Sequence, residues 1–265
     1  MSDAALSPAL LAHRDGPVFT ITAANPTRLN AWTAAMWQAL PGLIAEAEAD
    51  PQIRIIVLRG AGEAAFSAGA DISEFDSVRT GDAASSYDRL NDAAFDALAN
   101  CAKPTIAMIH GFCLGGGLGL ALSCDLRIAD EVARFAIPAA KLGLAYKARW
   151  IAALLRAVPP AFAKEILFTG RRLGPTEALA IGLVNRVVPP AGLAGEVGAL
   201  AAEIAANAPL SIAAAKETID TLSRPAAALD SPRFGALAAA CLDSRDYAEG
   251  RRAFMEKRKP VFEGR

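Results

Sequence analysis

The chain has 265 residues, 53% of them hydrophobic, and its 27 Lys and Arg against 28 Asp and Glu give a formal net charge of −1. This length and apolar content suffice for one large domain, or for a domain with an appendage, and the near-neutral charge gives no basis for binding nucleic acid or an anionic membrane. The two histidines, His13 and His110, lie far apart in the sequence, which disfavours a histidine-based metal site.

Short apolar runs alternate with longer helical patterns through the first half of the chain. Residues 17–22 and 53–59 read as strands, and the second is β-branched and apolar enough for a buried strand. Between them, Thr33 caps a predicted helix that runs toward Asp50, and Pro41 must kink or interrupt it.

Further short strands are expected at residues 105–109, 125–129 and 134–137, with a buried helix over 118–122. Beyond Arg149 the chain becomes alanine-rich and helical, broken only by the strand-like run at 184–188. Strands that alternate with helices, followed by helices, predict an α/β core with a helical extension.

The cysteine pattern and the N-terminus indicate a cytoplasmic protein. The four cysteines form no CxxC pair and suggest no disulfide framework, as expected in a reducing compartment. The N-terminus carries Asp3 and no basic run followed by an apolar one, so no signal peptide is expected. Charged residues interrupt every stretch that approaches the roughly 20 apolar residues of a membrane span.

Two glycine-containing loops follow predicted strands. The first is FSAGADISEF, beginning at Phe66, and the second is HGFCLGGGLG, beginning at His110. Glycines at a strand-to-helix turn expose backbone N–H groups that can bind an anion or a developing oxyanion. Tight helix–strand packing explains either loop equally well in isolation. The spacing fits neither a dinucleotide-binding loop nor a phosphate loop, and Ser67 lacks the frame of a nucleophile elbow.

The pair of loops, separated by about 40 residues, resembles the crotonase (enoyl-CoA hydratase/isomerase) superfamily. The resemblance also covers NPTRLNAW near the start, ILFTGRRLGPTEALAIGLVNRVVP in the second half, and the final FMEKRKPVFEG. It implies an α/β fold with a crotonase-like ββα spiral core over residues 1–190 and a C-terminal helical oligomerisation region over 191–265. It also implies a homotrimer or homohexamer.

In that family two backbone N–H groups, one from each loop, polarise the thioester carbonyl of an acyl-CoA, and an enolate is the shared intermediate. The resemblance places these donors at Ala68 and Gly116. No metal or cofactor is implied, because CoA arrives as part of the substrate. The implied substrate and CoA contacts are Arg28, Leu29, Ala68, Gly69, Ala70, Asp71, Ile72, Leu114, Gly115, Gly116, Gly119, Pro138, Ala139, Leu144 and Lys257.

Several of these positions have an alternative interpretation. Asp71 is better interpreted as a group that fixes its loop than as a base. The tail around Lys257 either reaches CoA phosphate or is a solvated helix end. His110 is most simply a packed core residue.

The sequence departs from a hydratase at two positions. Hydratases of the family use two glutamates to position water and move the proton, and the corresponding residues here are Gly119 and Ala139. Each such acid or base is normally worth 10²–10⁴-fold in rate. Ordinary hydration therefore lacks its catalytic groups, and isomerases that keep only the second glutamate are disfavoured as well.

The segment KLGLAYKAR, from Lys141 to Arg149, carries three cations and no acid. Its LGLAY portion resembles methylmalonyl-CoA decarboxylases of the family, which place a tyrosine at the equivalent of Tyr146. Decarboxylation needs no base, and it requires a pocket that does not repel a substrate carboxylate. Tyr146 is then the candidate proton donor, whereas Lys141, Lys147 and Arg149 either assist or face solvent. A non-catalytic acyl-CoA-binding paralogue is the remaining alternative.

Overall fold

The structure is a computed structural model that describes residues 8–74, 82–223, 236, 239–240 and 242–261. It contains two sheets, and from residue 55 onward successive strands alternate between them. The six-stranded sheet contains, in spatial order, β1 (Ala9–Asp15), β2 (Val18–Ala24), β3 (Ile55–Gly60), β5 (Thr105–Ile109), β7 (Leu126–Asp130) and β9 (Arg186–Val188). The three-stranded sheet contains β4 (Ala65–Ser67), β6 (Phe112–Leu114) and β8 (Arg134–Ala136). Among the described strands, β1 and β2 pair antiparallel and the other pairs are parallel.

Parallel strands need crossover connections, and helices supply them. The α-helices are α1 (Ala34–Ala49), α3 (Asp82–Ala99), α4 (Gly116–Ser123), α5 (Ala148–Ala157), α6 (Pro160–Thr169), α7 (Pro175–Ala180), α8 (Leu193–Ala206), α9 (Pro209–Ser223) and α11 (Arg245–Met255). Short 3-10 helices are η1 (Pro26–Arg28), η2 (Ile72–Glu74), η3 (Ala139–Leu142) and η4 (Pro190–Gly192). A strand of each sheet followed by a helix therefore repeats along the chain, which confirms the predicted spiral of ββα turns.

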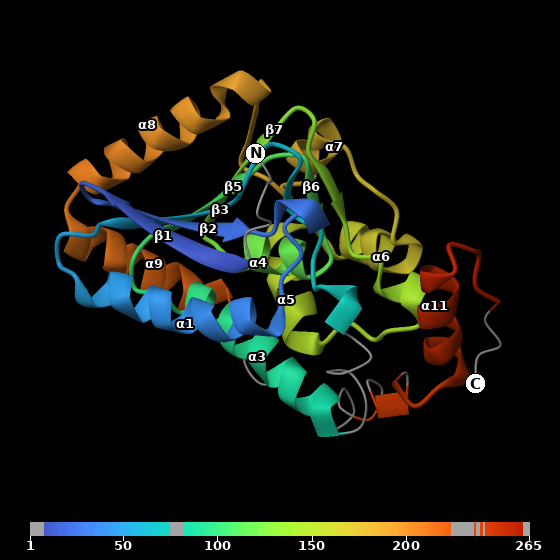
Figure 1. Ribbon diagram of the computed structural model, residues 1–265. Coiled ribbons are helices and arrows are strands. Elements are labelled where there is room, and N and C mark those ends of the chain that lie inside the picture. The colour runs from blue at the N-terminus through green and yellow to red at the C-terminus, as the bar shows by residue number, and fades with distance from the viewer. Residues whose placement is uncertain (1–7, 75–81, 224–235, 237–238, 241, 262–265) are drawn as a thin grey trace, which may run out of the picture.

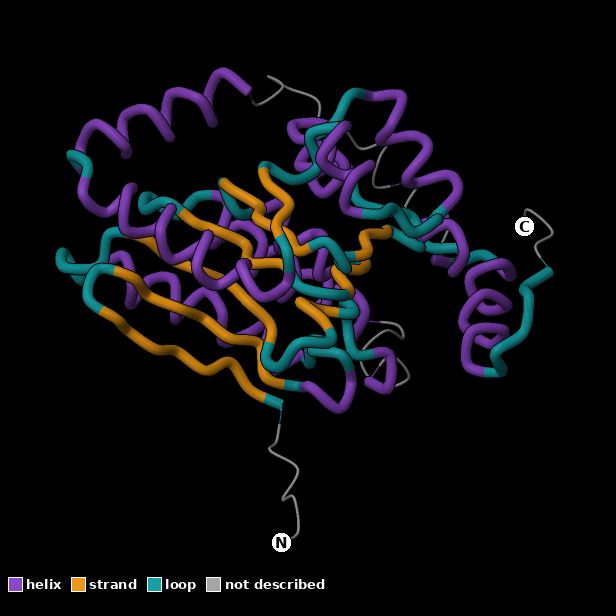
Figure 2. Tube along the Cα trace, turned by 90° about the horizontal axis from the view of Figure 1, so that it is seen from above, coloured by secondary structure: helices purple, strands orange, loops and turns teal. Residues whose placement is uncertain are grey.

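Helices cover both faces of the large sheet, with α8 on one side and α1 on the other (Figures 1 and 2). Successive side chains of a strand point to opposite faces. Ile55 and Val57 of β3 accordingly pack in the cluster that contains α8, whereas Ile56 and Leu58 pack in the cluster that contains α1. Burial on both faces explains why β3 is a continuous apolar run, as predicted.

The predicted strand and helix positions hold, with one difference in α1. Thr33 caps this helix by accepting a hydrogen bond from the N–H of Met36 (3.3 Å). Pro41 neither ends nor interrupts the helix, which continues to Ala49. The buried side chains of Leu40 and Ile44, on either side of Pro41, anchor the helix to the core.

Three strands have no clear sequence signal. The strands β4 and β6 contain three residues each, too few to display a periodicity, and most of the edge strand β1 is exposed. Both short strands lead directly into the glycine loops, so they decide where those loops meet.

The C-terminal helices differ in what they cover. Helix α8 packs against the large sheet through Leu193, Val197 and Ala201. Helix α11 lies at the opposite end of the molecule, beside η3 (Figure 1). No single helix of the described ranges meets the length and hydropathy of a membrane span, although Pro190–Ala206 and Pro209–Ser223, bent by 106°, pass that test together.

The histidines and cysteines lie as the sequence suggested where the structure describes them. His110 is buried at the end of β5, and His13 is exposed on β1. Three of the four cysteines are free and buried, namely Cys101, Cys113 and Cys124. Cys241 and the last four residues of the tail lie outside the described residues.

Candidate active site

The two glycine loops meet because Gly69 has no side chain. Its φ of +100° belongs to a backbone conformation that favours glycine. A Cβ at this position would lie 2.9 Å from the carbonyl oxygen of Leu114 and 3.2 Å from the nitrogen of Gly116. The loop after β4 therefore rests directly on the backbone of the loop after β6.

In the first loop the N–H of Ala70 has no acceptor among the described residues, whereas that of Ala68, the predicted donor, has one. The Ala68 N–H donates to the carbonyl oxygen of Leu29 (2.9 Å) and is already engaged. Ala70 forms a parallel bridge with Trp32. The N–H of Trp32 donates to the carbonyl oxygen of Gly69 (2.7 Å), and the N–H of Asp71 donates to that of Trp32 (2.8 Å). Trp32 makes both hydrogen bonds of this bridge, with the neighbours of Ala70, so the N–H of Ala70 itself points away from Trp32. It therefore lies on the side of the cavity that Ala70 lines.

Gly116 is the predicted second donor, and its N–H lies beside that of Ala70. It is the first residue of α4, and the opening N–H groups of a helix have no acceptor within the helix. A Cβ on Gly116 would lie 3.7 Å from the nitrogen of Ala70, so the two residues are neighbours. Neither N–H has an acceptor within the part of the chain that the structure describes. Two unpaired donors side by side can stabilise an oxyanion.

A cavity of about 750 Å³ opens in front of these donors. Thirteen of the predicted site residues line it: Arg28, Ala68, Gly69, Ala70, Asp71, Ile72, Leu114, Gly115, Gly116, Pro138, Ala139, Leu144 and Tyr146. Leu29, Gly119 and Lys257 are the three predicted residues that do not line it. The structure therefore brings together segments from four separate parts of the sequence.

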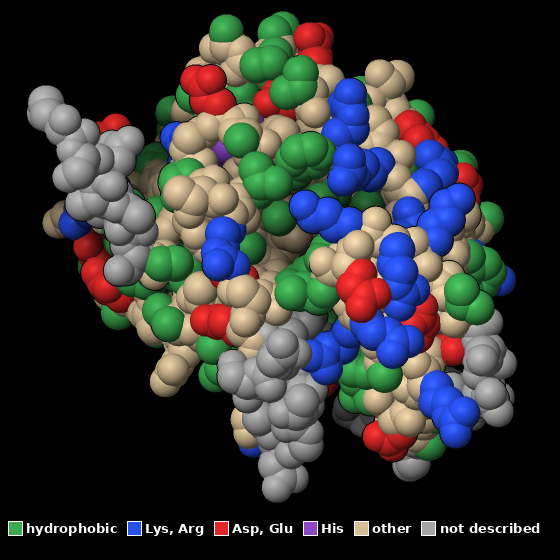
Figure 3. Space-filling model, turned by 45° about the vertical axis from the view of Figure 1, so that its right-hand side comes forward, with side chains coloured by type: hydrophobic (Ala, Val, Ile, Leu, Met, Phe, Trp, Pro, Cys, Tyr) green, Lys and Arg blue, Asp and Glu red, His purple; other side chains and the backbone are tan. Residues whose placement is uncertain are grey.

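Cations outnumber acids around the cavity. Arg28, Lys141, Arg172 and Arg258 line it, and Figure 3 shows Lys and Arg side chains gathered in the right-hand half of one face of the molecule. Asp71 is the one acidic side chain among the lining residues that the structure describes. Such a wall suits a polyanionic ligand.

One carboxylate oxygen of Asp71 holds the loop in place. Its Oδ1 accepts hydrogen bonds from Arg28 (3.0 Å) and from the N–H (3.0 Å) and hydroxyl (2.7 Å) of Ser73. These contacts are those of a group that fixes a loop, and they leave Asp71 poorly suited to act as a base.

Aromatic rings close the other end of the cavity. Phe95 of α3 stacks edge-on against Trp37 (5.6 Å between centroids) and Trp150 (5.4 Å). A Cβ at Gly119 would lie 2.8 Å from Cζ of Phe95 and 3.3 Å from the hydroxyl of Tyr146. Residue 119, where the family resemblance places the first glutamate of hydratases, is thus closely surrounded by the rings of Phe95 and Tyr146.

The hydroxyl of Tyr146 is buried and has no hydrogen-bond partner among the described residues. Its ring packs against Trp150 at 5.2 Å between centroids. Burial raises the pKa of the Tyr146 phenol well above its ordinary value, with a smaller contribution from Cys113. Tyr146 is therefore protonated at neutral pH and can donate a proton into the cavity that it lines.

The cations beside Tyr146 turn away from the cavity. Lys147 pairs with Asp92 (2.9 Å) and Asp88 (3.3 Å), and Arg149 pairs with Asp96 (2.8 Å). Of the three cations in this segment, only Lys141 lines the cavity. Lys147 and Arg149 therefore pair with acids of α3 and do not line the cavity, so neither is placed to contact a ligand in it.

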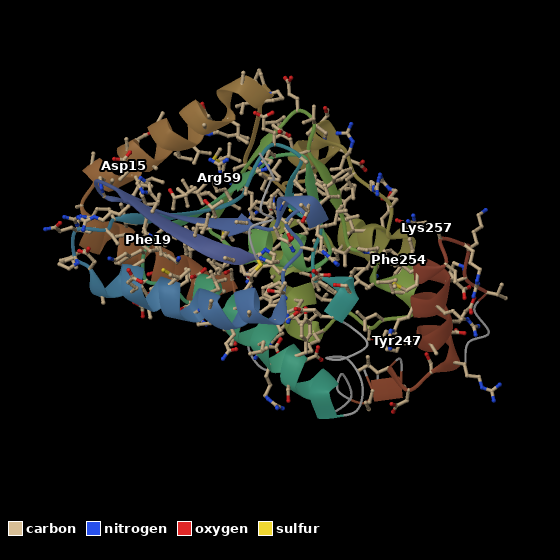
Figure 4. All side chains as sticks on the ribbon, viewed as in Figure 1. Asp15, Phe19, Arg59, Tyr247, Phe254 and Lys257 are labelled. Carbon is tan, nitrogen blue, oxygen red and sulfur yellow. The ribbon has the colours of Figure 1, made fainter. Side chains whose placement is uncertain are left out.

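Helix α11 closes the cavity from the C-terminal side. A Cβ on Gly250 would lie 2.6 Å from the carbonyl of Leu142, so the helix lies directly on the backbone of η3. Phe254 faces the body of the protein and lines the cavity, whereas Lys257 lies beyond the end of the helix (Figure 4). The tail reaches the cavity through Arg258, which also pairs with Glu249 (2.6 Å), rather than through Lys257.

Asn91, Phe95, Trp150 and Arg172 also line the cavity and were not predicted. Asn91 and Phe95 lie four residues apart on one face of α3, and this spacing is the sequence signal that could have identified them as a pair. Nothing local in the sequence indicates that their helix faces the glycine loops.

Residues 13–265 match the family model described as enoyl-CoA hydratase/isomerase. A short-chain-enoyl-CoA hydratase of Clostridium acetobutylicum is 35% identical over 94% of this chain and 95% of its own length. A carnitinyl-CoA dehydratase of Escherichia coli K12 is 37% identical over 98% of this chain and its whole length.

Solved structures agree with these relatives. A methylmalonyl-CoA decarboxylase in complex with 2-nitronate-propionyl-CoA has a TM-score of 0.88 at 32% identity, covering 97% of this chain and 98% of its own. An enoyl-CoA hydratase/carnithine racemase from Magnetospirillum magneticum has a TM-score of 0.79 at 40% identity, covering 97% and 96%. The chain belongs to the enoyl-CoA hydratase/isomerase family and has the crotonase fold.

Proposed function

We propose that this protein binds an acyl-CoA with its thioester oxygen between the N–H groups of Ala70 and Gly116, and that it stabilises the thioester enolate there. The two unpaired, adjacent donors carry the proposal. They are fixed by the fold and need no titration, and one such donor is typically worth about 3–4 kcal/mol in the transition state. No cofactor is required, since CoA is part of the substrate.

The orientation of the substrate follows from the two ends of the cavity. Lys141 and Arg172 line the cavity and, with Arg28 and Arg258, which already pair with Asp71 and Glu249, offer N–H donors for the CoA phosphates. The acyl group then extends past the two donors toward Phe95, Tyr146 and Trp150. This end carries no carboxylate at residues 119 or 139, so a hydratase mechanism has no base to activate water.

Decarboxylation of a 2-carboxyacyl-CoA is the reaction that these groups support best. The bond between Cα and the carboxylate breaks, CO₂ leaves, and the electron pair passes into the enolate held by Ala70 and Gly116. Tyr146 then donates its hydroxyl proton to Cα and regains one from water. The similarity to a methylmalonyl-CoA decarboxylase structure supports this assignment.

Incubation with methylmalonyl-CoA and with crotonyl-CoA, followed by detection of CO₂ and of hydrated product, tests the proposal. We expect CO₂ release from the first and no efficient hydration of the second, and we expect Tyr146→Phe to lower turnover of methylmalonyl-CoA. Efficient hydration without CO₂ release would overturn the decarboxylase assignment. Tight acyl-CoA binding without turnover of any thioester would instead identify a non-catalytic paralogue.

We also propose that the protein is a homotrimer or homohexamer, as expected for this family. Helix α9 supports this, because its apolar side chains Leu210, Ile219 and Leu222 are 84%, 64% and 81% exposed in the single chain. Light scattering after size exclusion measures the oligomeric mass, and a monomer at micromolar concentration would contradict the proposal.

A further inference from the structure

One carboxylate, that of Asp92 on α3, binds both groups that flank Tyr146. Its Oδ2 accepts a hydrogen bond from Nζ of Lys147 (2.9 Å), the residue that directly follows Tyr146. Its Oδ1 accepts one from Nε1 of Trp150 (3.0 Å), whose ring packs against Tyr146. Lys147 also lies 5.0 Å above the Trp150 ring, so the three side chains form a closed triangle.

No hydrogen bond fixes the Tyr146 hydroxyl among the described residues, so its orientation depends on packing against the core and on its backbone. Tyr146 lies in the stretch between η3 and α5. Besides the core, the groups beside Tyr146 are the Trp150 ring and Lys147, the next residue in the chain. Both donate hydrogen bonds to Asp92.

We propose that Asp92 is a positioning residue, which holds the hydroxyl of Tyr146 at the acyl end of the cavity through Trp150 and Lys147. This inference rests on the proposed function, in which Tyr146 delivers the proton. Proton delivery requires close alignment, and a displacement of about 1 Å can cost about 100-fold in rate.

The neighbouring acids of α3 provide the control. Asp96 pairs with Arg149 in an exposed ion pair (51% and 40% side-chain exposure) and is one helical turn from Asp92. Asp88 contacts Lys147 at 3.3 Å, whereas Nε1 of Trp150 donates to Asp92. Asp96→Ala thus removes an acid and an ion pair from the same helix without touching the triangle.

Fluorine NMR of protein labelled with 3-fluorotyrosine tests the positioning directly. The chain has three tyrosines, and Tyr146→Phe identifies the resonance of Tyr146. We expect Asp92→Ala to shift or broaden that resonance while the resonance of Tyr247 stays in place, and Asp96→Ala to leave both unchanged. An unshifted Tyr146 resonance in Asp92→Ala would overturn the inference, as would an equal shift in Asp96→Ala.

A double-mutant cycle with methylmalonyl-CoA separates this inference from the proposed function. We expect Asp92→Ala to lower kcat by about 10- to 100-fold with a smaller change in KM, and Asp92→Asn, which keeps an acceptor for Trp150, to retain more activity. In a Tyr146→Phe background, Asp92→Ala should cost nothing further. Additive losses would refute the positioning role. If the Tyr146→Phe single variant keeps full activity, the proposed function is refuted instead, and the NMR result decides whether Asp92 positions Tyr146.

Discussion

Substitution of Gly119 tests whether the aromatic end of the cavity is as closely packed as described. Gly119→Ala would place a Cβ 2.8 Å from Cζ of Phe95, closer than two carbon atoms can approach. Phe95 is 5% exposed and is held between Trp37 and Trp150, so it cannot move aside freely.

Two opposing effects determine the free energy of unfolding of Gly119→Ala. Replacing glycine by alanine inside a helix stabilises by about 1 kcal/mol. Adding a methyl group to a packed core costs about 1–3 kcal/mol. We therefore expect a net change between about zero and a loss of 2 kcal/mol. Gly198→Ala, at an exposed position of α8 with nothing within 4 Å of the new Cβ, should show only the gain.

Urea unfolding of both variants under the same conditions provides the measurement. Gly119→Ala should unfold at a lower urea concentration than Gly198→Ala, by a difference equivalent to about 1–3 kcal/mol. Adding Phe95→Leu to Gly119→Ala should recover part of the loss from the clash. If Gly119→Ala stabilises as much as Gly198→Ala does, the packing described for the acyl end is incorrect.

Three further predictions concern the donors, the buried histidine and the closing helix. Gly116→Pro, at a helix position that tolerates proline, should lower kcat by about 10²–10³-fold, whereas Gly116→Ala, which keeps the N–H, should lower it far less; equal losses would contradict the donor role. Burial, with a smaller contribution from Arg59, lowers the pKa of His110. As the pH falls below about 6.5, the unfolded chain therefore binds a proton that the folded chain does not, and the folded state loses stability. His110→Gln should therefore flatten the loss of stability between pH 7 and 5, and an unchanged slope in thermal melts would count against it. Gly250→Ala should displace α11 from Leu142 and speed proteolysis of the C-terminal segment, and protection equal to that of the parent protein would show that the contact is not needed.

The sequence predicted the elements whose residues carry a local signal. The apolar run of β3 and the capping threonine of α1 are readable because neighbouring residues create the pattern. The glycine loops were identified in the same way, but the free donor lay two residues beyond Ala68. The spacing of residues in the loop does not show that the bridge to Trp32 leaves the N–H of Ala70 free.

Contacts between distant segments explain the remaining differences. Lys147 and Asp92 are separated by 55 residues, and nothing near either one indicates that they pair. Three cations lie within the nine residues from Lys141 to Arg149, but acids on α3 pair with two of them. Phe95 belongs to the site only because α3 folds against α4 and α5.

The two donors are backbone groups, so they do not depend on the side chains that supply acids, bases or proton donors. Substitutions at residues 119, 139 and 146 alter which acid, base or proton donor meets the substrate, yet none of them removes the N–H of Ala70 or Gly116. A mutational path between reactions can therefore pass through intermediates that still bind and polarise a thioester. Under the proposed function, the scaffold can therefore lose one activity and acquire another while it still binds CoA thioesters.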